Sequence, residues 1–354
     1  MLRTHVLGTG FVVGEHCVKN DALSQVMDTT DDWIRERSGI EQRYYVEKGT
    51  ATSDLGVAAA RKALADAKVE AKDVDYVVFA SMTPDYYFPG CGSLLQAKLG
   101  LPMVPALDIR QQCSGFVYGL QVSDALLRSG QARTLLFVGA EVHSGFMPWD
   151  DAQFDLLFGK PSGKAPSEAQ REWNTRFRDR TVLFGDAAGA LVLRASEGEG
   201  GVLGFRLHSD GAPYDQLYVP SCGFANRPYT SDVDFKEGRH IPVMNGKGVF
   251  KMAVQRLPEV VREVCAQQKV SVQDIDQLIM HQANLRICEL VQRSLELPDA
   301  KVYNNIQKYG NTTAATIPIA YDECRKSGRV KKGDLVCFAS MGAGFHWAAA
   351  LVRE

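Results

Sequence analysis

The chain has 354 residues, of which 45% are hydrophobic and 23% charged, and its formal net charge at pH 7 is -2. This composition is typical of a globular protein with one large core or two fused cores, and it excludes a disordered or fibrous chain. The small net charge provides no general basic field for nucleic acid.

The eight cysteines are scattered along the chain without the close paired spacing of a zinc site or redox pair. We therefore expect reduced thiols in a cytoplasmic protein, and no metal. The N-terminal stretch MLRTHVLGTGFVVGEH contains Gly and Thr interruptions, and no small-residue cleavage site follows it, so it predicts a first buried strand. Further along, strands alternate with amphipathic helices, which indicates α/β architecture. The predicted helices are Ser53 to Lys68, Cys113 to Ser129, Leu285 to Leu297 and Thr312 to Ser327.

Cys113 follows an apolar strand around Val104 to Ile109 and stands at the start of the helix SGFVYGLQVSDALLRSG. At a helix start, unpaired backbone N–H groups and the helix dipole favour a thiolate. We therefore expect a lowered pKa and a sulfur that can attack a thioester. A single cysteine is also a common buried small residue, so the choice of Cys113 depends on the residues that accompany it.

Between Gly145 and Arg180 lies a long excursion that contains a polar Pro/Gly/Lys stretch, Gly159 to Ser167. Polar loops of this size lie on the surface and often border a site.

Two pairs of segments indicate an internal duplication. VEAKDVDYVVFA at Val69 matches VSVQDIDQLIMH at Val270, and the same offset lays LLFVGA at 135–140 over VCFASM at 336–341. Applied to the N-terminus, the offset places the second half after the Gly/Glu loop that ends at Gly201. We predict one half at residues 1–200 with the nucleophile and another at 201–354.

The second half contains a histidine and an asparagine at element ends. His281 follows an apolar strand, Gln277 to Met280, and Asn311 lies in YGNTTAATIP at a helix entrance. The duplication carries Cys113 onto Ala314, so pseudo-symmetry would bring the two helix starts together. His and Asn side chains can both donate hydrogen bonds to a thioester oxygen, as an enolate requires. Each also has an ordinary structural interpretation, a buried core His and a helix-capping Asn.

The uncharged run Leu335 to Val352 is long enough to span a membrane, but glycines interrupt it, so we predict strand, turn and strand rather than a span. Its turn, Met341-Gly342-Ala343-Gly344, lets the backbone approach a ligand closely. The backbone N–H groups of Ala343 and Cys113 could together hold an oxyanion. A β-hairpin without chemistry would have the same pattern.

Together, the helix-start Cys, HQANLRI, YGNTTAA and MGAGFHWAAALVRE resemble the β-ketoacyl-acyl-carrier-protein (ACP) synthase III family over the whole chain. The resemblance implies a five-layered αβαβα thiolase-like fold of two pseudo-duplicated halves, a homodimer and no cofactor. It also implies a ping-pong reaction in which Cys113 takes an acyl group from acyl-CoA. Malonyl-ACP is then decarboxylated, with its enolate held by His281 and Asn311, and attacks the acyl thioester.

The same resemblance assigns binding residues. It implies CoA contacts, an aromatic residue that reaches across the dimer to the acyl pocket, and a basic patch for ACP. The CoA residues are Thr29, Trp33, Arg37, Arg180, Gly246 and Asn284, the acyl-pocket residue is Phe88, and the ACP residues are Lys251, Arg286 and Arg293.

Three departures from the family pattern border the acyl site: Gln111-Gln112 before the Cys, Ala343 in place of a glycine, and the long 145–180 segment. They leave the acyl primer open, in primary or secondary metabolism. A thiolase would need a second cysteine in the glycine turn and is set aside. Head-to-head joining of two acyl chains, acyl transfer to an alcohol or amine, and a non-catalytic acyl-ACP-binding paralogue remain as alternatives.

Overall fold

The computed structural model describes residues 2–354 and contains two five-stranded sheets with the same strand order and directions. In each sheet the first three strands are antiparallel neighbours and the last three are parallel. The first sheet runs β1 (Leu2–Val13), β7 (Ala187–Glu197), β6 (Thr134–Glu141), β4 (Tyr76–Ala80) and β5 (Ala106–Ile109). The second runs β8 (Gly201–Ser209), β14 (His346–Arg353), β13 (Leu335–Gly342), β11 (Gln277–Met280) and β12 (Val302–Tyr303).

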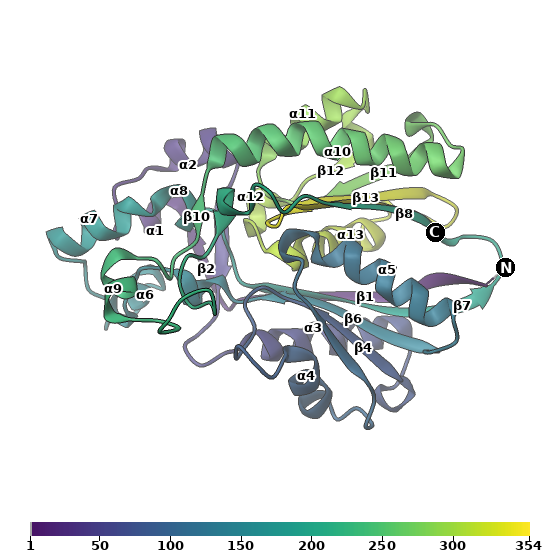
Figure 1. Ribbon diagram of the computed structural model, residues 1–354, viewed down its shortest axis with the longest axis horizontal. Helices are drawn as coiled ribbons and strands as arrows, with labels where there is room; N and C mark the ends of the chain where they lie inside the picture. The colour runs from purple at the N-terminus through teal and green to yellow at the C-terminus, as the bar shows by residue number, and fades with distance from the viewer. Residues whose placement is uncertain (1) are drawn as a thin grey trace.

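Helices fill three further layers (Figure 1). Two helices lie between the sheets, two cover the outer face of the first sheet, and two cover the outer face of the second. These are α5 (Gly115–Arg128) and α13 (Thr316–Lys326), then α3 (Thr52–Ala67) and α4 (Cys91–Leu99), then α10 (Gly246–Gln268) and α11 (Leu285–Ser294). Because both faces of each sheet are covered, β6 and β13 are buried along their whole length. The expected five-layered αβαβα fold is confirmed.

The offset of 201 residues is visible in the helix starts between the sheets. One-turn 3-10 helices, η2 (Gln112–Ser114) and η7 (Thr313–Ala315), precede α5 and α13 at equivalent positions. They pack closely, because a Cβ at Gly115 would lie 3.3 Å from the Cβ of Ala314. Pseudo-symmetry therefore brings the two helix starts together. The division at residue 200 stays a prediction; β7 ends at Glu197 and β8 begins at Gly201.

The excursion after β6 is more structured than we predicted. Residues 159–167 form a loop as expected, but helices flank it: α6 (Asp151–Leu157), α7 (Glu168–Arg176) and α8 (Arg178–Thr181). Ser167 and Gln170 form a capping box at the start of α7, a sequence signal that our prediction left out. Trp149 and Leu157 are buried with Tyr45 in a separate apolar cluster. This cluster rests on a small sheet, β2 (His16–Lys19) with β3 (Gln42–Tyr45), and on α1 (Asn20–Leu23) and α2 (Asp31–Ser38).

A second excursion, between β8 and α10, was not assigned from the sequence. It contains β9 (Leu217–Tyr218), α9 (Asp232–Glu237) and β10 (Val243–Met244). A short helix, α12 (Ile306–Tyr309), precedes Asn311 in the second half. As the sequence predicts, β13 and β14 form a hairpin, and within residues 2–354 no helix has the length and apolar character to cross a membrane.

Candidate active site

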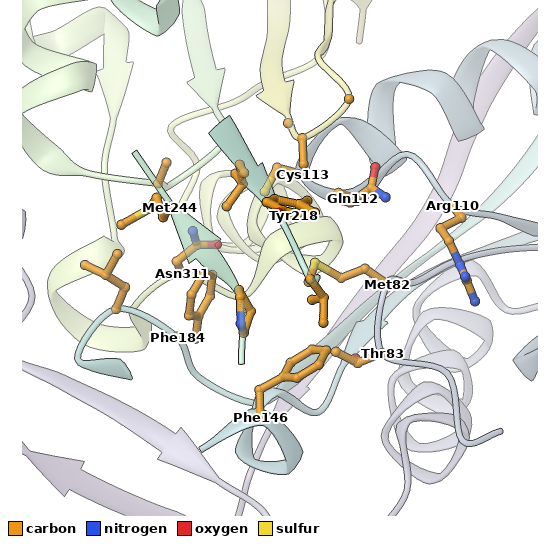
Figure 2. A pocket seen from close by; sticks show the side chains of 18 of the residues that line it. Met82, Thr83, Arg110, Gln112, Cys113, Phe146, Phe184, Tyr218, Met244 and Asn311 are labelled. Atoms are coloured by element: carbon orange, nitrogen blue, oxygen red, sulfur yellow. The ribbon is translucent and has the colours of Figure 1, made fainter. Parts of the chain in front are cut away.

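A cavity of about 910 Å³ opens where the two helix starts meet. Cys113, His281, Asn311 and Ala343 all line it, although they come from four separate segments of the chain. Figure 2 shows Cys113 and Asn311 in this cavity, with Phe146 and Thr83 on the side away from Cys113. The fold therefore brings together the catalytic residues that the sequence predicts.

The Cys113 thiol lies in η2, directly before α5, and Gln112 adopts the left-handed region with φ 45° to place it there. Burial raises the pKa of the Cys113 thiol to about 12, and the nearby Glu141 carboxylate acts in the same direction. Our expectation of a lowered pKa is therefore wrong for the free protein. Loss of water around the sulfur outweighs the hydrogen bonds from Thr313 and from the Cys113 backbone, which favour the thiolate.

Glu141, at the end of β6, is fully buried and accepts hydrogen bonds from one short segment. The donors are Ser81 Oγ, the backbone N–H groups of Met82 and Thr83, and Thr83 Oγ1 at 2.6 Å. Burial raises the pKa of Glu141 to about 7. These bonds fix the strand end against the wall of the cavity that Met82 and Thr83 form.

His281 follows β11 directly, and its backbone N–H donates to Ala339 O at 2.8 Å. Its ring Nδ1 lies 2.8 Å from Thr316 Oγ1, whereas its Nε2 is buried without a protein partner. Burial, with a contribution from His143, lowers the pKa of His281 to about 3, so the imidazole is neutral. The Thr316 hydroxyl has one proton, which it can donate either to Thr313 O at 3.0 Å or to His281 Nδ1. In the second arrangement Nε2 carries the ring proton and can donate to a ligand.

Asn311 has a fixed amide orientation. Its Oδ1 accepts the backbone N–H of Thr313 at 2.9 Å, which leaves the Nδ2 amide for the cavity. The backbone of Asn311 is held by Leu183 O and Gly185 N on the neighbouring segment. The His281 imidazole and the Asn311 amide can thus both act as hydrogen-bond donors beside Cys113.

The turn between β13 and β14 packs against the backbone of Cys113. A Cβ at Gly342 would lie 2.8 Å from Cys113 N and 3.0 Å from Ser114 N, so only glycine fits without backbone movement. Ala343, the next residue, lines the cavity. This close approach brings the turn that contains Ala343 against the backbone of Cys113, and the oxyanion pair itself stays a prediction.

Of the predicted CoA residues, Trp33 has the clearest surroundings. The guanidinium of Arg37 lies 4.4 Å from its ring centroid, and that of Arg178 lies 4.8 Å from it. Arg180, the predicted arginine, instead pairs with Asp179 and packs on Phe177. Arg178, two residues before Arg180, is therefore the second arginine that lies over the Trp33 ring, and the role of Arg180 in CoA binding stays a prediction.

The other predicted CoA residues have distinct positions. Asn284 and Gly246 line the cavity at the starts of α11 and α10, and Asn284 Nδ2 donates to Arg37 O at 2.7 Å. Thr29 is buried, and its hydroxyl has no protein partner among residues 2–354. Asn284 thus ties α11 to the helix that carries Trp33.

The predicted ACP residues Lys251, Arg286 and Arg293 are exposed on the neighbouring helices α10 and α11, and within residues 2–354 none of them forms an ion pair. Phe88 is 78% exposed and does not line the cavity of its own chain.

Several cavity residues were missed. Tyr214, Tyr218 and Cys222 come from the excursion after β8, which has no motif. His143 and Thr313, which hydrogen-bond to each other behind the catalytic groups, were also missed, because nothing local in the sequence marks them.

The comparisons with known proteins agree with this geometry. A family model described as 3-Oxoacyl-[acyl-carrier-protein (ACP)] synthase III C terminal matches residues 265–354. A second, described as 3-Oxoacyl-[acyl-carrier-protein (ACP)] synthase III, matches residues 107–165 and 162–211.

Among curated proteins, a beta-ketoacyl-[acyl-carrier-protein] synthase III from Rhodospirillum centenum is 42% identical, covering 99% of both chains. The protein with the same description from Ehrlichia canis is 38% identical over 100% of both. Among solved structures, 3-oxoacyl-[acyl-carrier-protein] synthase III from Aquifex aeolicus has a TM-score of 0.84 at 34% identity, covering 99% of this chain and 100% of that one. A priming beta-ketosynthase of a polyketide biosynthetic pathway has a TM-score of 0.84 at 29% identity, covering 99% and 96%.

Proposed function

The chain belongs to the β-ketoacyl-[acyl-carrier-protein] synthase III family, and we propose that Cys113, His281 and Asn311 perform its reaction. That reaction is the decarboxylative condensation of an acyl-CoA primer with malonyl-ACP, which initiates fatty acid synthesis. The observation that carries the residue assignment is the convergence of a thiol, an imidazole Nε2 and an amide Nδ2 in one cavity.

In the first half-reaction, Cys113 Sγ attacks the thioester carbon of acyl-CoA. The oxygen becomes an oxyanion, which the backbone N–H groups of Cys113 and Ala343 stabilise. Collapse of the intermediate breaks the bond to the CoA sulfur and leaves an acyl thioester on Cys113. Support for this step comes from the contact between the glycine turn and the nucleophile.

In the second half-reaction, malonyl-ACP loses CO₂, and the electrons of the broken bond form an enolate. His281 Nε2 and Asn311 Nδ2 donate hydrogen bonds to the enolate oxygen, and the enolate carbon attacks the acyl thioester on Cys113. The bond between the acyl carbon and Cys113 Sγ then breaks, so that β-ketoacyl-ACP leaves and the sulfur takes up a proton. The two groups suit this role because both are uncharged and already oriented by Thr316 and Thr313. No cofactor takes part in the proposed reaction.

CoA binding is assigned to Trp33 with Arg37 and Arg178, where an adenine ring can stack and a phosphate can pair. Thr29, Gly246 and Asn284 belong to the same proposed channel. ACP docking is assigned to Lys251, Arg286 and Arg293, whose exposed charges suit an acidic partner.

A cytoplasmic homodimer completes the proposal. Strand β5 is an edge of the first sheet, and its Leu107 is 38% exposed. An exposed edge strand is a template for pairing with a second chain. Pairing there would cover this edge and direct Phe88 toward the partner's acyl pocket. Light scattering after size exclusion tests the dimer, and a monomeric Leu107→Arg variant with retained secondary structure would support this interface.

The condensation is tested by intact-mass spectrometry with a panel of acyl-CoAs, each with and without malonyl-ACP. We expect the wild type to be acylated and Cys113→Ala not to be. Malonyl-ACP should be converted to β-ketoacyl-ACP, which has lost CO₂ and gained the acyl group of the primer. The primer that loads best separates fatty acid from polyketide priming. Loading without extension would instead support acyl transfer or head-to-head joining, and no loading by any acyl-CoA would contradict the proposed chemistry.

A further inference from the structure

Thr313 contacts Asn311 and Cys113 directly and is linked to His281 through Thr316. Its backbone N–H donates to Asn311 Oδ1, and its carbonyl lies 3.0 Å from Thr316 Oγ1, which contacts His281. Its own hydroxyl lies 2.7 Å from His143 Nε2 and is also close enough to hydrogen-bond to the Cys113 thiol. The residue holds an unusual backbone conformation, φ 49°, to do so.

The directions of these hydrogen bonds follow from the chemistry of the partners. His143 Nδ1 lies 2.8 Å from Gly185 O, and a carbonyl can only accept, so Nδ1 carries a proton. Burial lowers the pKa of His143 to about 4, so the ring is neutral and its Nε2 is an acceptor. The Thr313 hydroxyl must therefore donate to His143 Nε2, which leaves an oxygen lone pair for the S–H group of Cys113.

A buried thiol needs such an acceptor. With a pKa of about 12, Cys113 is a thiolate in only about one molecule in 100,000 at pH 7, so its proton must leave as the sulfur attacks. His281 Nε2 carries the ring proton in the tautomer that the proposed enolate step uses, and within residues 2–354 no hydrogen bond joins it to the thiol.

We propose that His143 is the proton acceptor for Cys113 during acyl loading and that the Thr313 hydroxyl relays the proton. This inference rests on the proposed acyl-Cys113 reaction. As Cys113 Sγ bonds to the acyl carbon, its proton passes to Thr313 Oγ1, and the hydroxyl proton of Thr313 passes to His143 Nε2. When the bond to CoA breaks, the proton returns along the same path to the departing CoA sulfur, and His143 is neutral again.

Burial opposes a positive charge on His143, but an aromatic ring and two acidic residues lie near it. Its ring stacks on Phe184 with centroids 4.8 Å apart, and the buried carboxyls of Glu141 and Asp186 lie on adjoining segments. Asp186 accepts a hydrogen bond from the Ser144 backbone next to His143. The neighbouring His281 interacts electrostatically with His143, and a charge on either ring disfavours a charge on the other.

The test separates the two half-reactions in the full-length protein. His143→Gln keeps an amide that can donate to Gly185 O and accept from Thr313 but cannot take up a proton. We expect single-turnover acylation of Cys113, followed by intact mass, to slow by about 100-fold, in the range of general-base effects. Decarboxylation of malonyl-ACP, which uses His281 and Asn311, should slow by less than about threefold. His5→Gln is the matched histidine control.

A second pair of variants tests the relay. Thr313→Ala removes the hydroxyl and should slow loading as His143→Gln does, and Thr313→Ser should recover most of the lost rate. The loading rate of His143→Gln should also rise about tenfold per pH unit from pH 6 to 9, because attack then requires a pre-formed thiolate, and the wild-type rate should vary much less.

Each outcome decides a different point. Wild-type-like loading by His143→Gln, or parallel pH profiles, would overturn the relay and leave the proposed condensation intact. If acyl loading and decarboxylation slow by the same factor, His143 has a structural role and is not the proton acceptor. If the wild type itself fails to load, the proposed function fails, not the relay alone.

Discussion

At the scale of single residues, burial decides the protonation of the site. Cys113 and His281 are both kept uncharged and the pKa of Glu141 is raised to about 7, because each group has lost water around its ionised form. The resting site therefore holds a thiol and a neutral imidazole rather than an ion pair of thiolate and imidazolium. Neutral groups are what the proposed enolate stabilisation uses, but they leave the thiol in need of a proton acceptor.

The raised pKa of Cys113 has a direct spectroscopic consequence. The absorbance difference at 240 nm between wild type and Cys113→Ala reports the thiolate of this residue alone. We expect this difference to stay flat from pH 6 to pH 9, because the pKa of the buried thiol is about 12. A step centred near pH 7 would contradict this and restore the lowered pKa that a helix start by itself suggests.

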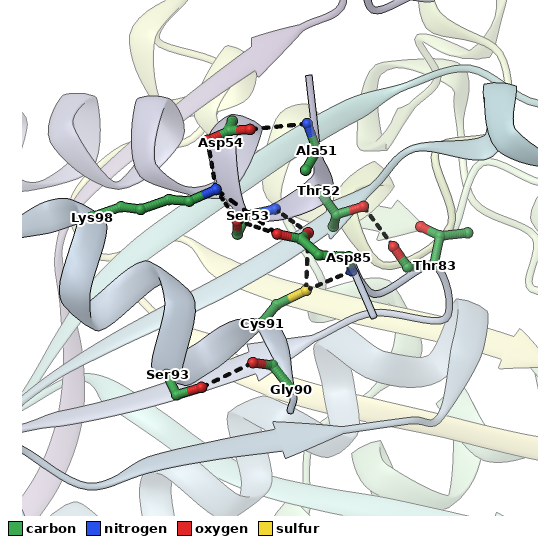
Figure 3. Close-up of polar contacts among 10 residues, drawn as sticks. All are labelled: Ala51, Thr52, Ser53, Asp54, Thr83, Asp85, Gly90, Cys91, Ser93 and Lys98. Atoms are coloured by element: carbon green, nitrogen blue, oxygen red, sulfur yellow. Dashed lines mark hydrogen bonds and ion pairs between the residues drawn. The ribbon is translucent and has the colours of Figure 1, made fainter. Parts of the chain in front are cut away.

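At the scale of elements, the site depends on close backbone approaches and on one polar cluster. The β13–β14 turn touches η2 through Gly342, and the segment 82–90 is tied to two helices. Figure 3 shows the second feature: Asp85 accepts from Ser53 N and Ser53 Oγ at the start of α3, and Lys98 of α4 contacts Ser53 and Asp54. Both features position cavity walls without taking part in the proposed chemistry.

Gly342→Ala tests the approach of the turn to the nucleophile. Its Cβ would lie 2.8 Å from Cys113 N, so one backbone segment must move, and we expect acyl loading to fall by at least about 100-fold. Gly211→Ala, where a Cβ meets nothing within 4 Å, is the control and should load normally. Intact mass follows both, and unchanged loading by Gly342→Ala would show that the turn can move without consequence.

Asp85→Asn tests the polar cluster. The change weakens acceptance from Ser53 and removes the charge that lies 3.8 Å from Lys98 Nζ. Because Asp85 is largely buried, we expect a loss of about 1–3 kcal/mol in the free energy of unfolding, measured in urea. The KM for acyl-CoA should also rise, because Met82 and Thr83 lie on the same segment. Exposed Asp151→Asn is the control, and equal stabilities would contradict the prediction.

At the scale of the whole molecule, buried acids and buried histidines oppose each other in the pH dependence of stability. Burial raises the pKa of Glu141 to about 7 and of Asp186 to about 6, so the folded chain keeps protons that the unfolded chain loses, and stability falls as pH rises to these values. Burial lowers the pKa of His143 to about 4 and that of His281 to about 3. Between these values and pH 6.5, the two histidines are protonated in the unfolded chain but not in the folded chain. The two neutral histidines therefore contribute fully to the free energy of unfolding above pH 6.5, and this contribution is lost as pH falls.

His143→Gln removes one of these opposing contributions. The stability of wild type relative to the variant should therefore increase by about 1.6 kcal/mol between pH 5 and pH 6.5, at 1.36 kcal/mol per proton and pH unit with the unfolded histidine half deprotonated at pH 6.5. Urea unfolding at several pH values measures this difference. A constant difference across the range would mean that the pKa of His143 is not lowered in the fold.

Local sequence patterns were enough to predict the α/β class, the duplication, and Cys113, His281 and Asn311 as candidate catalytic residues. Each of these depends on local signals: apolar strand runs, helix starts and glycine turns that repeat at a constant offset. The family resemblance added the five layers and the reaction class, and the fold and the comparisons bear both out. The catalytic roles of the three residues stay predictions until they are measured.

The pKa values of the site and the residues that contact the catalytic groups could not be predicted from local patterns, because both depend on long-range packing. The pKa of Cys113 depends on how much water the other half of the molecule excludes, and no local pattern contains that information. The position of Arg178 over the Trp33 ring, and of Arg180 over Phe177, depends on which side of a short helix turn faces each aromatic ring. His143 and Thr313 are 170 residues apart and meet only because two sheets stack on shared central helices. Long-range packing places such pairs, so they are visible only in the folded chain.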